Sequence, residues 1–398
     1  MGAKDASVST PHDDNEHRDG ARLLSREFLV LLGAVSLFGF SWSFYLILPK
    51  FFASELGMDA AAIGRAVAVQ GVTAVIVTPL VGWLVDRYGR RRWLIFGNVM
   101  LMVTGLLYLF VDHEGPLLYV AQMCWGMGLV MGFNSAGTMT ADIAPSDRMA
   151  EALGLFGAAN LGMNAISPTI AEVLAGSVGW TYVFAASASA GLLAALLGTR
   201  IREPARHEPR EHDVVIPVFS GPLVRVYGTT ILMTAAFTAL FTLHQPFALE
   251  LGVTEVRSFF IGFAIVALTV RLGGGRLIDR FGVLRSSIVA LVLYAAVPPM
   301  LGILGPEHLF EVGAMMGLGH GIAYPALTAL AIGRADAASR GMVVSIIHGA
   351  FNGGHAFFAY ALGWAAAQWN YSVAFWAAGV ITLAGALLLG AGRRPKAS

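Results

Sequence analysis

Three histidines in the C-terminal part of the chain, His320, His348 and His355, have the spacing to form one polar site. Because an α-helix turns once every 3.6 residues, His348, Asn352 and His355 share one helical face, and His320 and Tyr324 share another. Imidazole titrates near neutral pH, so these histidines suit both proton transfer and contact with a substrate. The pattern therefore favours a proton-linked binding site.

Other polar side chains lie inside long apolar stretches, where an unpaired polar group is costly unless it faces a cavity or a partner. Asn160 and Asn164, four residues apart, share a helical face. We predict a substrate cavity lined by Trp42, Tyr45, Gln70, Asn134, Asn160, Asn164, His244, His320, Tyr324, His348, Asn352 and His355. We predict that protons move through His320, His348 and Glu311.

Catalytic and metal chemistry find no support in the sequence. It contains no Walker Gly-Lys-Thr/Ser loop and no plausible Ser–His–Asp set. Its single cysteine, Cys124, excludes an internal disulfide and a cysteine-rich metal site. The glycine run 273–275 lies in an apolar stretch, where small residues indicate helix packing. We predict neither an enzyme, nor a cofactor, nor a metal centre.

Composition indicates the elements that must position these side chains. The chain is 56% hydrophobic and 13% charged, with a mean hydropathy of +0.68, whereas soluble domains carry about 25% charged residues. Its apolar residues come in blocks of about 20, the length of a helix that crosses a bilayer. We predict an all-α integral membrane protein with twelve transmembrane helices at 27–52, 60–86, 92–111, 116–143, 149–175, 180–200, 222–249, 256–279, 284–304, 307–332, 341–367 and 371–391.

The basic residues indicate how these helices are oriented. With a cytoplasmic N-terminus, twenty of the 26 basic residues lie in cytoplasmic segments, and only Lys50 and Arg257 lie in outside loops. Such a bias orients helices in a bilayer. We therefore predict a protein of the bacterial plasma (inner) membrane with both termini in the cytoplasm.

The polar segments divide the chain into two halves. We predict a disordered cytoplasmic tail at 1–26, a six-helix bundle at 27–201, a cytoplasmic linker at 202–219, a second six-helix bundle at 220–392 and a short tail at 393–398. The net charge of +1 gives no reason to expect a nucleic-acid partner. The expected partners are the lipid bilayer, a small-molecule substrate and protons, and we expect the protein to act as a monomer.

An internal repeat relates the two halves. Residues 82–89 (GWLVDRYG) match residues 275–282 (GRLIDRFG) at an offset of 193. Residues 148–162 match 340–354 in an arginine, two glycines, an alanine and an asparagine at an offset of 192. Two separate matches at nearly one offset predict two pseudo-symmetric bundles, as in transporters built from parallel repeats.

The segment Gly82-x-Leu84-x-Asp86-Arg87-x-Gly89, followed by two arginines, resembles the loop 2–3 signature of the major facilitator superfamily. The pattern is most similar to bacterial efflux-type members, such as drug and sugar exporters. The resemblance covers about residues 27–392 and implies a central cavity with alternating access by rocking of the two halves. It also implies that Asp86 faces the start of the helix near Arg340, as a cytoplasmic latch of the outward-facing state.

We predict a conformational latch made of Gly82, Asp86, Arg87, Gly89, Arg90, Asp142, Arg148, Arg271, Asp279, Arg280 and Arg340. Arg271 is flanked by apolar residues and is expected to pair with a carboxylate or a helix end. Glu172, near the outer end of its helix, is expected to face extracellular water.

We predict a secondary active transporter that moves a small organic solute, by proton-coupled export. The aromatic content and the few charges of the spans favour a weakly charged or amphiphilic substrate. Two alternatives remain open, which are proton-coupled uptake of a nutrient or organic acid and a non-transporting membrane sensor on the same fold.

Overall fold

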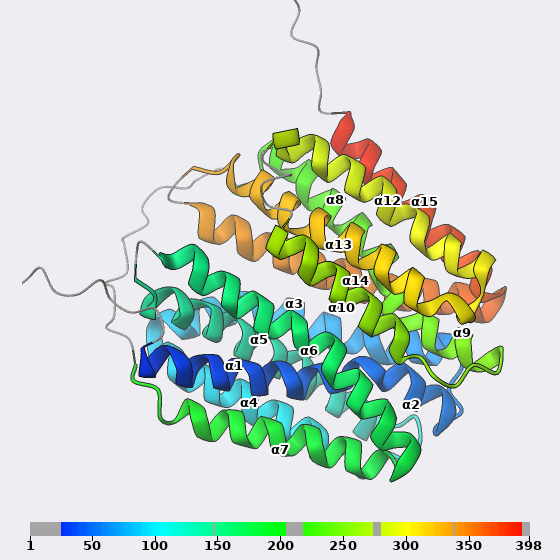
Figure 1. The fold of residues 1–398 in the computed structure, drawn as a ribbon, viewed down its shortest axis with the longest axis horizontal. Coiled ribbons are helices and arrows are strands. Elements are labelled where there is room, and N and C mark those ends of the chain that lie inside the picture. Colours follow the sequence, from blue (N-terminus) through cyan, green and yellow to red (C-terminus); the bar gives the residue numbers. More distant parts are fainter. Residues whose placement is uncertain (1–24, 146–147, 204–217, 274–279, 337–338, 392–398) are drawn as a thin grey trace, which may run out of the picture.

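The computed structural model of the chain describes residues 25–145, 148–203, 218–273, 280–336 and 339–391. Its described part is helical throughout (Figure 1). The helices of the first half are α1 (Arg26–Phe44), α2 (Leu48–Ser54), α3 (Ala60–Tyr88), α4 (Arg90–Tyr108), α5 (Pro116–Ile143), α6 (Met149–Ser177) and α7 (Trp180–Gly198). Those of the second half are α8 (Gly221–Thr238), α9 (His244–Glu250), α10 (Arg257–Gly273), α12 (Val283–Leu304), α13 (Leu309–Ile332), α14 (Arg340–Gln368) and α15 (Tyr371–Gly390).

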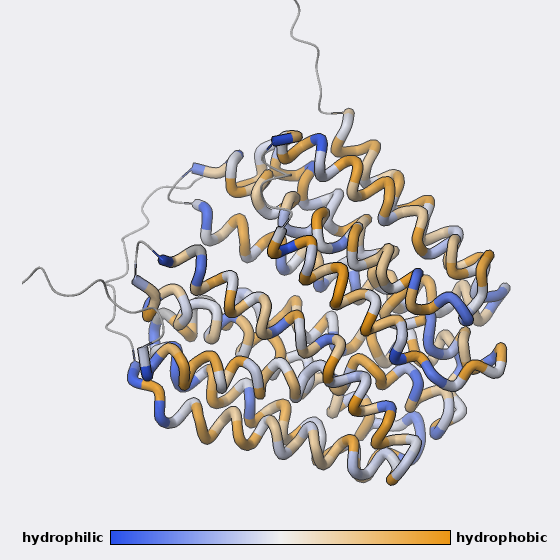
Figure 2. The backbone as a smooth tube through the Cα atoms, viewed as in Figure 1, coloured by the Kyte–Doolittle hydropathy of each residue, from blue (hydrophilic) through white to orange (hydrophobic). Residues whose placement is uncertain are grey.

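These helices confirm the predicted fold of twelve membrane-crossing helices, in which α1 with α2 and α8 with α9 each form one span. Within the described residues, the predicted and observed helix bounds differ most for the span predicted at 92–111, where the observed helix is Arg90–Tyr108. Eight of the described spans are long and apolar enough to cross a membrane by composition alone. Figure 2 shows hydrophobic residues along the helices and hydrophilic residues gathered at their ends.

The two halves repeat the same packing pattern. In the first half α4 packs on α5 and α7, α3 on α5, and α1 on α7. In the second half α12 packs on α13 and α15, α10 on α13, and α8 on α15. Each contact of one half has its counterpart at the same place in the other, which confirms the pseudo-symmetry predicted from the sequence repeat.

The first span of each half changes its helical form before a proline. In the first half the 3₁₀ segment η1 (Tyr45–Ile47) precedes Pro49, and in the second the π-helical segment η3 (Ala239–Leu243) precedes Pro246. Proline has no N–H to donate, and a change of helical form shifts the hydrogen-bond register. Backbone groups are therefore free for other partners at the same level of both spans.

The interface between the halves is closed at one end. We call the end where α1, α4, α6, α8, α12 and α14 begin the basic end. At the opposite end α3 packs on α14 and α6 packs on α10. Gly64 and Gly363 allow the α3–α14 contact, because a Cβ at Gly363 would lie 2.5 Å from the carbonyl oxygen of Ala60.

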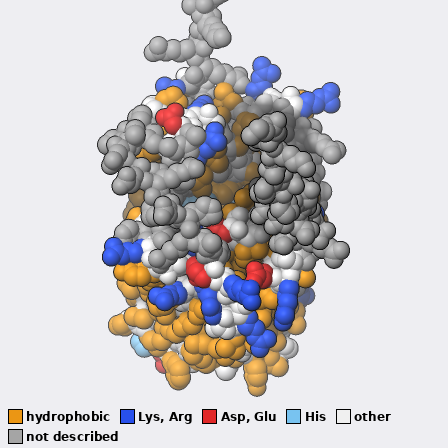
Figure 3. Space-filling model, turned by 90° about the vertical axis from the view of Figure 1, so that its left-hand side faces the viewer, with side chains coloured by type: hydrophobic (Ala, Val, Ile, Leu, Met, Phe, Trp, Pro, Cys, Tyr) orange, Lys and Arg blue, Asp and Glu red, His pale blue; other side chains and the backbone are white. Residues whose placement is uncertain are grey.

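At the basic end α6 and α14 have open space beside them. A Cβ added at Gly154 or Gly157 of α6, or at Gly341 or Gly349 of α14, would meet no atom within 4 Å. Figure 3 looks on to this end and shows Lys and Arg side chains around a recess with largely hydrophobic walls. A cleft of 780 Å³ also lies between α3 of one half and α8 and α14 of the other.

Candidate functional site

The centre of the second half holds a cluster of stacked rings. Tyr324 stacks on His320, with ring centroids 5.7 Å apart and planes at 14°, and on His348, at 6.3 Å and 16°. Phe237 lies 5.4 Å from His320 and 5.0 Å from Phe351. Helices α8, α13 and α14 thus bring together residues far apart in the chain. We call Phe237, His320, Tyr324, His348, Phe351 and His355 the histidine cluster.

The histidine cluster is buried to different degrees. His320 is 7% exposed, and its buried Nδ1 atom has no hydrogen-bond partner among the described residues. His355 shares a 2.9 Å hydrogen bond between its Nδ1 atom and the hydroxyl of Thr238. His348 is half-buried and lies edge-on to Phe133 of α5, with centroids 6.4 Å apart. The stack from His320 through Tyr324 and His348 therefore reaches the other half of the protein.

Several predicted cavity residues of the first half are half-buried or buried polar groups. The Ser43 hydroxyl donates to Asn164 Oδ1 at 3.0 Å. Trp42 Nε1 and Asn160 Nδ2 are buried without a partner in the described structure. Asn134 and, in α14, Asn352 are half-buried, while Gln70 is 4% exposed. The unpartnered donors are the groups best placed to gain from a polar ligand, because an unmade buried hydrogen bond is costly.

Three other predicted site residues lie elsewhere. Tyr45 is 1% exposed and donates to the carbonyl of Leu101 at 2.8 Å, inside the core of the first half. His244 is fully buried with its ring 4.2 Å from that of Phe259. Glu311 is exposed in the first turn of α13, where its carboxylate lies 3.9 Å from His308 Nδ1. Nine residues of helix, roughly 13 Å, separate Glu311 from His320, so we leave these three residues out of the site.

The closed end carries an ion pair within the first half, Lys50 of α2 with Glu172 of α6, and both side chains also bind the second half. Their side chains are 13% and 4% exposed. The Glu172 carboxylate also accepts the backbone N–H groups of Val256 and Arg257, at 2.8 Å each, at the start of α10. The expectation that Glu172 faces water is therefore wrong, because α10 of the second half covers it.

Gln245 completes this contact. Its amide nitrogen donates to the carbonyls of Leu46 at 2.8 Å and Phe241 at 3.0 Å, and its carbonyl accepts the Lys50 N–H at 3.1 Å. The partners lie at the breaks of the first span of each half, where backbone groups are free. We call Lys50, Glu172 and Gln245 the outer clamp. A lysine directly after a proline and a glutamine directly before one are the sequence signals for it.

The predicted latch residues lie at the basic end, in part outside the described residues. Asp279 lies outside the described residues, and neither the surroundings of Gly82 nor the side chain of Asp86 is described. Arg90 forms an ion pair with Asp142 at 3.1 Å, and Arg148 pairs with Glu151 at 2.7 Å. Both pairs lie within the first half. Arg87, Arg280 and Arg340 are exposed at this end.

The loop between α3 and α4 is held by a residue that the sequence did not single out, Glu203. Its carboxylate accepts the backbone N–H groups of Arg90 at 2.6 Å and Arg91 at 3.0 Å, at the start of α4. A carboxylate is favoured there by the unpaired N–H groups and the positive end of the helix dipole. The loop signature thus fixes the segment that leads out of the first half.

Gly89 is expected to tolerate no side chain, for two reasons. Its φ of +93° is unfavourable for other residues, and a Cβ would lie 2.6 Å from a Glu203 carboxylate oxygen. We expect Gly89→Ala to lower the midpoint of thermal unfolding, measured on the purified protein, more than Gly179→Ala. Gly179 has a φ of +98° but open space around its Cβ position. Equal losses for the two variants would contradict the role of Glu203.

Arg271 lies in the last turn of α10, the helix that packs on α13 of the second half. It is exposed and follows Ala267 by one turn on α10, where the Cα of Ala267 faces Gly321 of α13. The ion pairs of the described structure do not include it. The structure thus places Arg271 on the helix that packs on α13 of the histidine cluster, with no described carboxylate in an ion pair with it.

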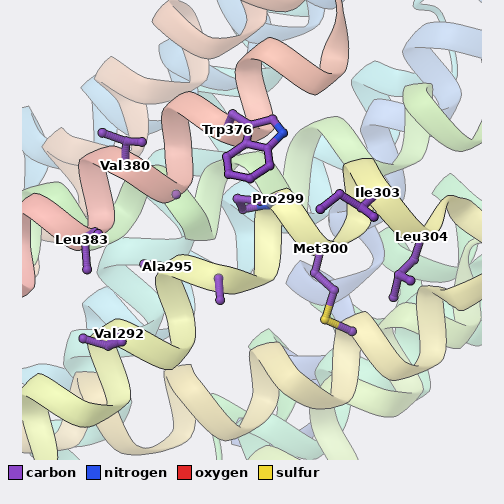
Figure 4. A pocket seen from close by; sticks show the side chains of 11 residues that line it. Val292, Ala295, Pro299, Met300, Ile303, Leu304, Trp376, Val380 and Leu383 are labelled. Atoms are coloured by element: carbon purple, nitrogen blue, oxygen red, sulfur yellow. The ribbon is translucent and has the colours of Figure 1, made fainter.

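A separate apolar groove of 520 Å³ lies between α12 and α15 (Figure 4). Pro299, Met300 and Trp376 contribute to its lining, and many of its residues are exposed, such as Ile303 at 68% and Val380 at 63%. These helices lie on the outside of the second half (Figure 1). The groove carries no polar side chain and is not part of the site.

Comparisons with known proteins agree with this architecture. The sequence matches the profile of the Major Facilitator Superfamily over residues 29–306 and 225–398. It is 27% identical to multidrug resistance protein 1 of Bacillus subtilis over 57% of this chain and 60% of that protein. It is 25% identical to the multi-drug resistance efflux pump PmrA homolog of Lactococcus lactis, over 72% and 76%, and 24% identical to the purine ribonucleoside efflux pump NepI of Salmonella typhimurium, over 51% and 52%. The chain therefore spans less than two thirds of the Bacillus and Salmonella relatives.

Solved structures share the fold at low identity. The xylose transporter XylE from E. coli in its inward-open conformation matches with a TM-score of 0.74 and 16% identity, over 93% of this chain and 97% of that one. The nucleoside transporter NupG matches with a TM-score of 0.72 and 12% identity, over 92% and 99%.

Proposed function

This chain belongs to the major facilitator superfamily, and from that premise we propose that it exports a small organic solute by proton-coupled alternating access. One observation carries the proposal, which is the asymmetry of the interface between the halves. The outer clamp joins the halves at one end, and glycines of α6 and α14 have open space beside them at the other. This is the arrangement expected of one state of a rocking transporter.

The basic end is the cytoplasmic end in this proposal. The positive-inside bias supports that assignment, so the described conformation opens to the cytoplasm. A solute then enters from the cytoplasm and meets the histidine cluster at the middle of the interface. Export is supported by relatives named as efflux pumps.

Proton coupling is assigned to His320 and His348. Both belong to the stack that ends at Phe133 of the other half, so a change of charge there acts on the contact between the halves. Protonation of buried or half-buried imidazole changes its hydrogen bonding and its cost of desolvation. Desolvation disfavours imidazolium, so a solute whose apolar body excludes water from these rings can expel a proton when it binds, as antiport requires.

The test adds solutes to the purified, weakly buffered protein and measures proton release. Purine ribonucleosides, cationic dyes and aromatic acids are the solutes to compare. Solute-dependent release by the wild type supports antiport, while binding without release would overturn it. Direction is then measured in inside-out and right-side-out vesicles. Accumulation of the solute in inside-out vesicles whose interior is acidic indicates export. Accumulation in right-side-out vesicles whose exterior is acidic would indicate uptake instead.

A further inference from the structure

We propose that the site binds an organic anion, with its carboxylate held by Arg271 and Tyr324. This inference rests on the proposed transport function and names its substrate class. It starts from a cation that the packing of α10 on α13 places at the level of Tyr324 in the histidine cluster, and that lacks a carboxylate partner in the described structure.

Helix packing fixes the level of Arg271. Every fourth residue of α10 faces α13, because a Cβ at Gly313 would meet the carbonyl of Phe259, one at Gly317 the carbonyl of Phe263, and one at Gly321 the Cα of Ala267 at 3.4 Å. One turn further along α10 comes Arg271. One turn further along α13 comes Tyr324, so the guanidinium and the phenol share a level of the bundle.

The charge of Arg271 is not balanced by a described neighbour. The described acidic residues of the second half lie at or beyond helix ends, namely Glu250, Glu255, Glu307, Glu311 and Asp336. A guanidinium at membrane depth is costly without a counter-ion. Its planar set of N–H donors matches a carboxylate in two parallel hydrogen bonds. A bound carboxylate would therefore supply the missing negative charge.

The side chains around Tyr324 indicate the chemical character of the rest of the ligand. Tyr324 adds a phenolic donor, and His320 Nδ1 is a buried atom without a partner in the described structure. Phe351 lies 5.2 Å from Tyr324, and Phe133 closes the stack from the other half. One cation among aromatic rings suits a single carboxylate on an aromatic or apolar body. The weakly charged substrate expected from the sequence thus becomes a monoanion.

The experiment compares two probes of the same shape, 2-naphthoate and 2-naphthamide. Binding is measured by probe fluorescence on the full-length protein in nanodiscs of uncharged lipid. We expect the wild type to bind the acid at least tenfold more tightly than the amide. Arg271→Gln is expected to remove that preference with the affinity for the amide unchanged, which also shows that the variant is folded. Arg271→Lys is expected to retain part of the preference.

The matched control is Arg285→Gln, which removes an exposed arginine from α12 at the basic end and is expected to leave the preference intact. Equal affinities for acid and amide in the wild type, no binding of naphthoate, or a preference that survives Arg271→Gln would overturn the anion site. If the wild-type protein transports other solutes but does not bind naphthoate, this inference is overturned and the proposed transport function stands. Arg271-dependent naphthoate binding without flux of any solute supports the anion site and overturns that function.

Discussion

Replacing Glu172 with alanine is expected to shift the protein strongly away from the conformation closed at the outer clamp. The substitution leaves the Lys50 ammonium and the first N–H groups of α10 without their shared partner. Breaking a buried ion pair by removing one member costs about 3–5 kcal/mol. A conformation that opens this end to water rehydrates those groups, so about 3 kcal/mol, roughly a hundredfold, favours the open state.

Cysteine labelling of the protein in nanodiscs measures this shift. Ser43→Cys is a reporter behind the outer clamp, since Ser43 is fully buried, and the native Cys124 is replaced by serine. We expect the maleimide reaction of this cysteine to accelerate by up to a hundredfold on adding Glu172→Ala. A second reporter, Gly157→Cys at the open end, is expected to react more slowly.

Two further variants test whether the effect of Glu172→Ala comes from loss of the outer clamp or from a general loss of stability. Lys50→Ala is expected to have a smaller effect, because Glu172 keeps its two backbone donors. Arg65→Gln removes an exposed ion pair with Glu114 at the same end, whose described hydrogen bonds all stay in the first half, unlike those of Glu172, and is expected to change neither reporter. Unchanged labelling in Glu172→Ala, or equal acceleration by Arg65→Gln, would contradict the outer clamp.

Replacing His348 with phenylalanine is expected to uncouple transport from protons with little change in packing. A phenyl ring can still lie between Tyr324 and Phe133, but it cannot bind a proton. With the solute that gives the largest proton release in the wild type, we expect release and gradient-driven transport to fall at least tenfold. Exchange of labelled for unlabelled solute across the membrane needs no net proton movement and is expected to persist.

His244→Phe is the matched control. His244 is fully buried in the second half, against Phe259 and Phe260, and lies outside the histidine cluster. Its replacement is expected to leave proton release unchanged. Proton release that survives in His348→Phe, and in His320→Phe as well, would remove the histidine cluster from the coupling mechanism.

The sequence by itself determined the membrane fold. Apolar blocks of bilayer length, basic residues on one side and a repeat at offsets of 193 and 192 predicted twelve helices in two related halves, and the helix ends agree closely. These signals are local, because hydropathy and helical period act within one span. The shared faces of His320 with Tyr324 and of His348 with His355 follow from the same period.

Only the tertiary structure decided which polar residues meet. Tyr45 and Asn164 look alike in the sequence as polar groups in apolar helices, but packing places Tyr45 in a core and Asn164 against Ser43. Glu172 is buried only because α10 of the other half covers it, and Glu203 is a helix cap only because α4 starts beside it. Arg271 comes to the level of Tyr324 through the packing of α10 on α13. A side chain's partner depends on helices far away in the chain, and the period of its own helix cannot specify them.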